Sequence, residues 1–156
     1  MLSTLFPFAA GIASLLVAGV FLSFSDFVMR GIAQEAPIPA GAAAMQGLNR
    51  TVYRSLFMVL LIGLLPVALA LAGAGLAGAL PRAPLLIAAA LTYVLGVAMV
   101  TGRGNVPMNH RLDAMSATGP EARSYWPRYA RDWTRLNHIR TAAAALSGLM
   151  WLLAAR

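Results

Sequence analysis

Cysteine and lysine are both absent from this chain of 156 residues, and charged residues of all kinds make up only 11% of it. Without cysteine there is no disulfide, no thiolate chemistry, and no zinc or iron–sulfur site built on thiolates. A soluble domain carries about 25% charged residues, so a water-solvated globular domain is excluded. With 60% hydrophobic residues, the chain has the composition of a membrane protein.

Sequence motifs for several common chemistries are also missing. There is no P-loop, no dinucleotide-binding fingerprint, and no pair of carboxylates at di-iron spacing. The two histidines, His110 and His138, are too few for a convincing metal or haem site, although a site that joins them to Asp26 stays open. We therefore expect no metal and no cofactor.

Four uncharged stretches are present, at residues 1–25, 55–81, 83–102 and 141–155. The first three are long enough to cross a bilayer as helices. Together with the shorter fourth stretch, they predict an all-α fold: an integral membrane four-helix bundle that forms one domain over residues 1–156. The expected helices cover about 5–29, 39–72, 84–102 and 133–155, with a short helix at about 107–116.

All 12 basic residues are arginine, and they are unevenly distributed. Only Arg82 and Arg156 lie on the side opposite to the first and third connections. The positive-inside rule then predicts periplasmic termini and cytoplasmic long connections, in what we expect to be a bacterial inner membrane. The net charge of +7 therefore indicates orientation in a membrane, and no nucleic acid partner is expected. Nine arginines lie in the two long connections: Arg30, Arg50, Arg54, Arg103, Arg111, Arg123, Arg128, Arg131 and Arg135.

The last apolar segment is too short to span by itself. Its 15 uncharged residues, Thr141 to Ala155, cover about 22 Å of helix, whereas a bilayer core is about 30 Å thick. The helix must therefore include upstream residues, which draws Asn137, His138 and Arg140 toward membrane depth. An ionisable group there is costly unless it is paired. Trp133, Asn137 and Arg140 share one helical face at i, i+4 and i+7.

Polar residues of the other helices are expected at the same level. Asp26 ends the first helix and is the nearest candidate partner of Arg140, with the carbonyls of Asn105 or Asn109 as alternatives. Asn49 lies near the interface of the second helix. Asn105 and Asn109 lie four residues apart around a proline and face the same way. The alternative interpretation is that these groups cap helix ends or tie the helices together. We predict that they meet at one site.

The residue types at this site suit the deprotonation of a carbon acid. Histidine can accept a proton near neutral pH, and arginine stabilises an oxyanion or enolate. Asparagine offers both a donor and an acceptor. We therefore assign His138 as the base, with Arg140, Asn137 and Asn109 stabilising the enolate. Substrate-binding groups would be Trp133, as the ring-stacking wall, and Asn105, Asn49 and Asp26.

Four sequence blocks stand out in this chain: SFSDFVM (23–29), AMQGLN (44–49), NVPMN (105–109) and WTRLNHIRT (133–141). In this order and spacing they resemble the anthrone oxygenase-like family of small four-helix membrane proteins. Departures from the family pattern are Arg30, where proline is frequent, and Leu136, where an aromatic residue is common. The resemblance implies oxidation of an anthrone to an anthraquinone by molecular oxygen, without metal or flavin.

Two functional hypotheses remain open at this stage. The first is a cofactor-independent oxygenase that acts on a lipophilic small molecule drawn from the bilayer. The second is a non-catalytic membrane module that binds a lipophilic ligand or a partner protein. The two differ in whether the polar set borders a cavity or is packed and fully paired. Self-association into a homo-oligomer also stays open.

Overall fold

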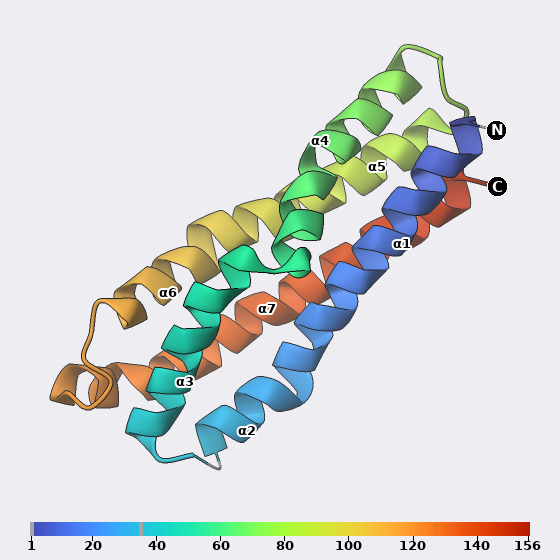
Figure 1. The fold of residues 1–156 in the computed structure, drawn as a ribbon. Helices are drawn as coiled ribbons and strands as arrows, with labels where there is room; N and C mark the ends of the chain where they lie inside the picture. Colours follow the sequence, from blue (N-terminus) through green and yellow to red (C-terminus); the bar gives the residue numbers. More distant parts are fainter. Residues whose placement is uncertain (1, 35) are drawn as a thin grey trace.

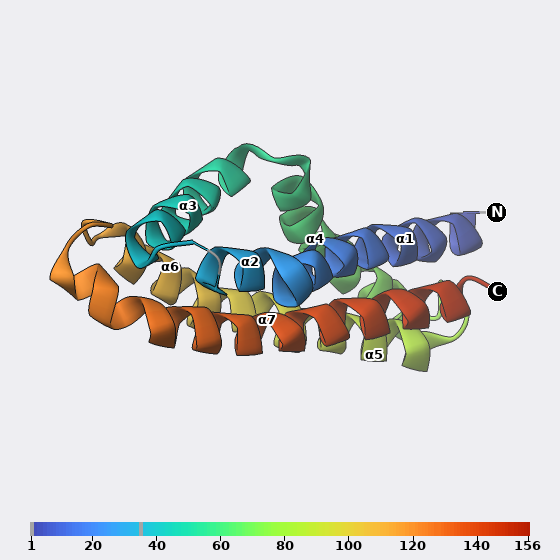
Figure 2. The same cartoon turned by 90° about the horizontal axis from the view of Figure 1, so that it is seen from below.

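The computed structural model describes residues 2–34 and 36–156, and within these ranges it contains helices and no strand. The helices form an elongated bundle with both termini at one end (Figures 1 and 2). The predicted all-α fold is therefore confirmed. In chain order the elements are α1 (Leu2–Ser23), η1 (Phe24–Val28), α2 (Met29–Gln34), α3 (Ile38–Thr51), η2 (Val52–Arg54), α4 (Leu56–Leu76), α5 (Ala83–Tyr93), η3 (Val94–Met99), η4 (Thr101–Asn105), α6 (Val106–Asp113) and α7 (Pro120–Ala154).

The predicted second helix at 39–72 is wrong, because the chain breaks in its middle. A short 3-10 turn, η2, follows α3, and Ser55 then adopts an extended conformation with φ −99° and ψ 154°. The Ser55 hydroxyl accepts the backbone N–H of Met58 at 3.2 Å and so caps the start of α4. Serine favours such caps over helix interiors because it can bond to nearby backbone groups. Figure 2 shows the resulting sharp bend between α3 and α4.

The third segment is longer and more continuous than predicted. Helical structure runs from Ala83 to Asp113, and the predicted short helix at 107–116 is the end of this helix, α6. Two π-helical segments, η3 and η4, lie within it. Pro107 lies in the first turn of α6, directly after the widened turn of η4. Proline has no backbone N–H to donate at this position.

The last helix begins well before the predicted start at 133. With 35 residues, α7 is about 52 Å long and runs the length of the molecule (Figure 2). Pro120 occupies its first turn, a position where proline costs no hydrogen bond. Residues 120–124 therefore form its first turns.

Among the described residues, three helical stretches are long and apolar enough to cross a membrane. They are Ser3–Gln34, Leu56–Leu76 and Ala83–Asp113. The first consists of α1, η1 and α2, so the predicted first helix at 5–29 continues by more than one turn. These three helices are compatible with a membrane protein. The charged first half of α7 distinguishes it from them.

The bundle has two buried hydrophobic clusters, one toward each end. The cluster near the termini joins α1, α4, α5 and α7, and there Gly11 and Gly148 let α1 and α7 approach closely. The cluster at the other end contains Met29, Trp126 and Tyr129. Along α7, the residues between the two clusters are those that carry the candidate site.

Candidate functional site

Arg140 is buried in the bundle with only 5% of its surface exposed. Its Nη2 donates to Asn137 Oδ1 at 2.6 Å and its Nη1 donates to Thr101 Oγ1 at 3.4 Å. Its Nε is buried without an acceptor. Within residues 2–34 and 36–156, no carboxylate forms an ion pair with this guanidinium. The expected burial of Arg140 is confirmed, and among the described residues its charge has no anionic partner.

Two aromatic rings flank the guanidinium. Arg140 Cζ lies 4.3 Å from the ring centroid of Phe21 and 5.2 Å from that of Trp133. Cation–π contacts of this kind contribute about 2 kcal/mol when desolvated, whereas burying an ion costs several kcal/mol. The rings therefore offset only part of the cost. An anion bound nearby would offset more of it.

Asn137 connects Arg140 to the first helix. Its Nδ2 donates to the backbone carbonyl of Phe21 and to Ser25 Oγ, both at 2.6 Å. Its Oδ1 accepts from Arg140. The side chain is fully buried and uses both of its amide hydrogens. As predicted from the sequence, Asn137 and Arg140 share one face of α7.

A second set of polar side chains holds Trp133. Trp133 Nε1 and Tyr129 OH both donate to Asn109 Oδ1 at 2.8 Å. Asn105 Nδ2 donates to the carbonyl of Trp133 at 3.1 Å, while its own Oδ1 is buried without a donor. Asn49 Nδ2 donates to Tyr129 OH at 3.4 Å. Asn49, Asn105 and Asn109 are therefore brought together around Trp133, as the sequence predicts.

Asp26 does not join this site, so the predicted Asp26–Arg140 pair is wrong. Its carboxylate pairs with Arg30 at 3.3 Å on the surface, with 65% of the side chain exposed. The reason is helix geometry. Ser25 points at Asn137, and successive residues of a helix point in different directions.

His138 is exposed on the outer side of α7, for the same reason: its neighbour Asn137 faces the interior. Its imidazole forms no hydrogen bond or ion pair with the described side chains. The structure therefore does not bring His138 into direct contact with the buried polar set. His138 lies on a groove that is also lined by Ser25, a neighbour of the buried polar set.

This groove, of about 420 Å³, runs between the η1–α2 segment and α7. Ser25 lines it and links it to Asn137, so the groove is two side chains away from Arg140. Its volume lies within the range of small-molecule sites, about 300–1,000 Å³. The lining residues are Ser25, Met29, Arg30, Ala33, Gln34, Ala130, Arg131, Thr134, Arg135 and His138.

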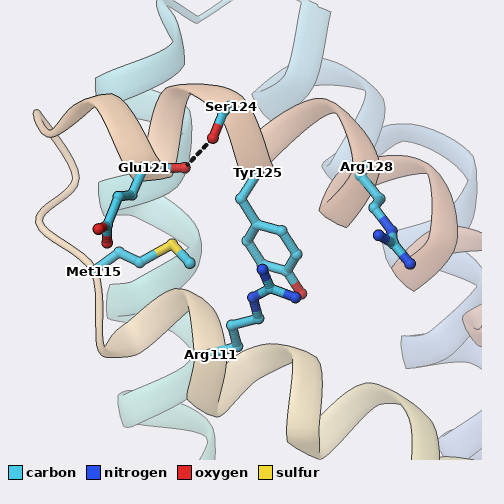
Figure 3. A pocket seen from close by; sticks show the side chains of 6 residues that line it. All are labelled: Arg111, Met115, Glu121, Ser124, Tyr125 and Arg128. Atoms are coloured by element: carbon cyan, nitrogen blue, oxygen red, sulfur yellow. Dashed lines mark hydrogen bonds between the residues drawn. The ribbon is translucent and has the colours of Figure 1, made fainter.

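Another pocket, of about 480 Å³, lies beside the connection from α6 to α7 (Figure 3). There the Arg111 guanidinium lies over the Tyr125 ring, 4.4 Å from its centroid. Burial raises the pKa of the Tyr125 hydroxyl, so this phenol is neutral at physiological pH. The pocket is also lined by Met115, Glu121, Ser124 and Arg128. None of these side chains bonds to Arg140 or to its hydrogen-bond partners.

Two π-helical segments supply the partners of α7. In η1 the N–H of Met29 bonds to the carbonyl of Phe24, five residues back, and this widened turn contains Ser25. In η4 the N–H of Val106 bonds to the carbonyl of Thr101 in the same way. Such segments are rare and frequently mark functional sites.

Sequence reasoning missed four residues of the site: Phe21, Ser25, Thr101 and Tyr129. Tyr129 had a usable signal, since it lies one turn before Trp133 on the same face of α7. Ser25 lies within a sequence block that already carried the family resemblance. Phe21 and Thr101 are an apolar and a small polar residue in apolar runs, and no sequence pattern distinguishes them.

Comparison with known proteins gives one family. The model of the anthrone oxygenase family matches residues 50–150, which include Asn105, Asn109, Trp133, Asn137 and Arg140. No curated protein and no solved structure matches the chain. The match covers more than half of the chain, and this protein therefore belongs to the anthrone oxygenase family.

Proposed function

We propose that this protein is a membrane-embedded, cofactor-independent oxygenase that oxidises an anthrone-like polycyclic phenol to a quinone. The observation that carries the proposal is the buried Arg140 guanidinium, which lies between two aromatic rings and has no carboxylate partner within residues 2–34 and 36–156. Such a group stabilises an anion that forms on an aromatic ligand. Family membership supports the same reaction class.

The proposed reaction balances without a further reductant. The methylene carbon of the anthrone loses a proton, and the resulting enolate passes one electron to O₂. Recombination of the two radicals forms a carbon–oxygen bond, and loss of water from the hydroperoxide leaves the quinone. One anthrone and one O₂ give one anthraquinone and one water. The protein must bind the flat ring, accept the proton and stabilise the enolate.

The groove between η1–α2 and α7 is the proposed location of the ring. His138 lies on the groove wall and is assigned as the proton acceptor. The positive charge of Arg140 stabilises the bound anion through Asn137, which accepts a hydrogen bond from Arg140. Asn105 and Asn109 act indirectly in this proposal, because their amides bond to Trp133, whose ring borders the guanidinium.

We further propose that α7 is a fourth membrane-spanning helix beside the three apolar ones. In this arrangement the arginine-rich ends of the helices lie in the cytoplasm of a bacterium and both termini lie in the periplasm. The buried Arg140 would then lie near the cytoplasmic interface, and a lipophilic substrate would arrive from the bilayer. A reporter fused after Arg156 should give a periplasmic signal, and a cytoplasmic signal would contradict this orientation.

The decisive experiment measures oxygen uptake and quinone formation by the purified protein with 1,8-dihydroxyanthrone. Empty detergent micelles and heat-inactivated protein correct for spontaneous oxidation. The Arg140→Lys variant keeps the charge but loses the planar fork that bonds to Asn137 and Thr101. We expect its turnover to fall by about 100-fold, as for the loss of one oxyanion-stabilising donor.

Arg50→Lys is the matched control, because Arg50 is exposed, pairs with Asp113, and neither residue lines the groove. Its turnover should equal that of the unaltered protein. A rate no higher than that of the heat-inactivated sample would reject the oxygenase proposal.

One observation favours the second candidate, a non-catalytic module. Asn137 uses both amide hydrogens to tie α7 to the first helix, as a purely structural clamp would. This candidate predicts binding of an anthrone without acceleration of its oxidation. The same oxygen-uptake experiment, combined with a binding measurement, separates the two.

A further inference from the structure

The hydrogen-bond chain that begins at Arg140 can run in only one direction. A guanidinium has donors and no acceptor, so the Asn137 atom that faces Arg140 Nη2 at 2.6 Å must be its oxygen. The orientation of the Asn137 amide is thereby determined, and its Nδ2 faces the first helix. There it donates one hydrogen to Phe21 O and the other to Ser25 Oγ.

This direction decides the role of the Ser25 hydroxyl. Because Ser25 Oγ accepts from Asn137, its own hydrogen remains free to donate. Ser23 is different, since its hydroxyl donates to the carbonyl of Gly19 at 2.9 Å. The Ser25 hydroxyl, in contrast, donates no hydrogen bond among the residues that the structure describes. Ser25 is only 7% exposed, yet it lines the groove that also contains His138.

The three donors lie in series and reinforce one another. Arg140 polarises the Asn137 amide, and the amide in turn polarises the Ser25 hydroxyl, because bonds in a chain strengthen each other cooperatively. The last donor in this series is the hydroxyl hydrogen of Ser25, beside the groove. Because Ser25 is nearly buried, a donor without an acceptor is costly there. Only an acceptor that enters the groove can complete the series.

We propose that the Ser25 hydroxyl binds the phenolate or enolate oxygen of a flat aromatic ligand in the groove, and so is a catalytic residue of this protein. The catalytic role rests on the proposed oxygenase function, whereas the binding role does not. Arg140 and Asn137 are positioning residues in this arrangement, because they act on the ligand through Ser25.

The proton and the electron pair then take separate routes. The methylene proton moves to His138 on the α7 wall of the groove. The electron pair of the broken carbon–hydrogen bond delocalises onto the ring oxygen, which the Ser25 hydroxyl holds by a hydrogen bond. No covalent bond to serine forms. Oxygen, the oxidant named above, then receives one electron from the enolate.

The test uses a phenol that does not need to be oxidised. For the protein in detergent, we would titrate bound 4-nitro-1-naphthol, whose phenolate absorbs visible light, and record its pKa. Binding to the unaltered protein should lower that pKa, because a donated hydrogen bond favours the charged form. Ser25→Ala should raise it again by about one unit, a tenfold change in the ionisation equilibrium.

Two further variants make the test specific. Ser25→Thr keeps the hydroxyl and should restore the lowered pKa. Ser23→Ala, two residues away and bonded only to its own helix, should leave the pKa unchanged. If Ser25→Ala fails to fold, Ser25→Cys replaces it, since a thiol keeps the size of the side chain but donates weakly.

The outcomes separate this inference from the proposed function. Equal probe pKa values in the unaltered protein and in Ser25→Ala, or in Ser25→Cys, would overturn the inference even if oxygen uptake were observed. A Ser25-dependent pKa without oxygen uptake would support the binding site and reject the oxygenase. With both activities present, Ser25→Ala should lower kcat with 1,8-dihydroxyanthrone by at least about tenfold.

Discussion

The two halves of α7 pack against the same first helix by different means. In the second half, the contact is made by small residues: Gly148 lies against Gly11, and Ser14 of α1 donates to the carbonyl of Ala144 at 2.8 Å. In the first half, up to Arg140, the contacts are aromatic rings and amide side chains. One helix thus combines a close-packed region with a polar region.

The two halves of α7 also differ in the polar groups that they bury. In the close-packed half, hydroxyls such as that of Ser147 donate to carbonyls of neighbouring helices, and no charged residue is buried. In the polar half, Arg140 is buried without an ion pair to any described carboxylate. Each half also has a buried polar atom without a partner, Trp151 Nε1 in the close-packed half and Asn105 Oδ1 beside the polar half. A buried charge of this kind adds little stability by itself. The two halves therefore differ in the buried guanidinium, and the proposed ligand site lies on the first half.

The largest expected effect on stability comes from filling the close-packed half. In Gly11→Leu, the new Cβ would lie 2.7 Å from Leu152 Cγ and 3.0 Å from the carbonyl of Gly148, and backbone cannot give way cheaply. We expect a loss of about 3 kcal/mol, the upper part of the range for overpacking. Unfolding in detergent measures it. Gly19→Leu is the control on the same helix, because no atom lies within 4 Å of its added Cβ; an equal loss there would contradict the comparison.

A smaller effect is expected when the buried charge is removed. Arg140→Met leaves Asn137 Oδ1 without its donor, which costs about 1–3 kcal/mol, but also removes the several kcal/mol of desolvating a guanidinium. The free energy of unfolding should therefore change by about 1 kcal/mol or less, while turnover is lost. A stability loss of about 4 kcal/mol would instead identify Arg140 as a structural clamp and weaken the functional interpretation of this half.

The smallest effect concerns an exposed charge at the edge of the polar half. Asp132 bonds to Arg131 and Arg128, and the Arg131 guanidinium in particular lowers the pKa of its carboxyl. A lowered native pKa adds stability above the unfolded value, about 3.9, and that stability is lost as the pH falls through the native pKa. The melting temperature of Asp132→Asn should therefore fall less than that of the unaltered protein on acidification from about pH 5 to about pH 3. Identical pH profiles would show that the pair contributes nothing.

Sequence alone predicted an all-α fold with long apolar segments, and that Arg140 would be buried. The reason is length: residues 141–155 are too few to span, so the helix must include Asn137 and Arg140. Residues that share a face of one helix, such as Asn105 with Asn109 or Trp133 with Asn137, also follow from a fixed period of 3.6 residues.

Only the tertiary structure decided which residue of each neighbouring helix meets that face. The π-helical turns η1 and η4 change the helical phase locally, so Ser25 rather than Asp26 points at Asn137. Likewise, the helix predicted over 39–72 is interrupted at Ser55, because the Ser55 hydroxyl accepts the N–H of Met58 and caps a new helix. Such outcomes depend on the rotation of packed helices and on competing local hydrogen bonds, which a periodic sequence pattern does not encode.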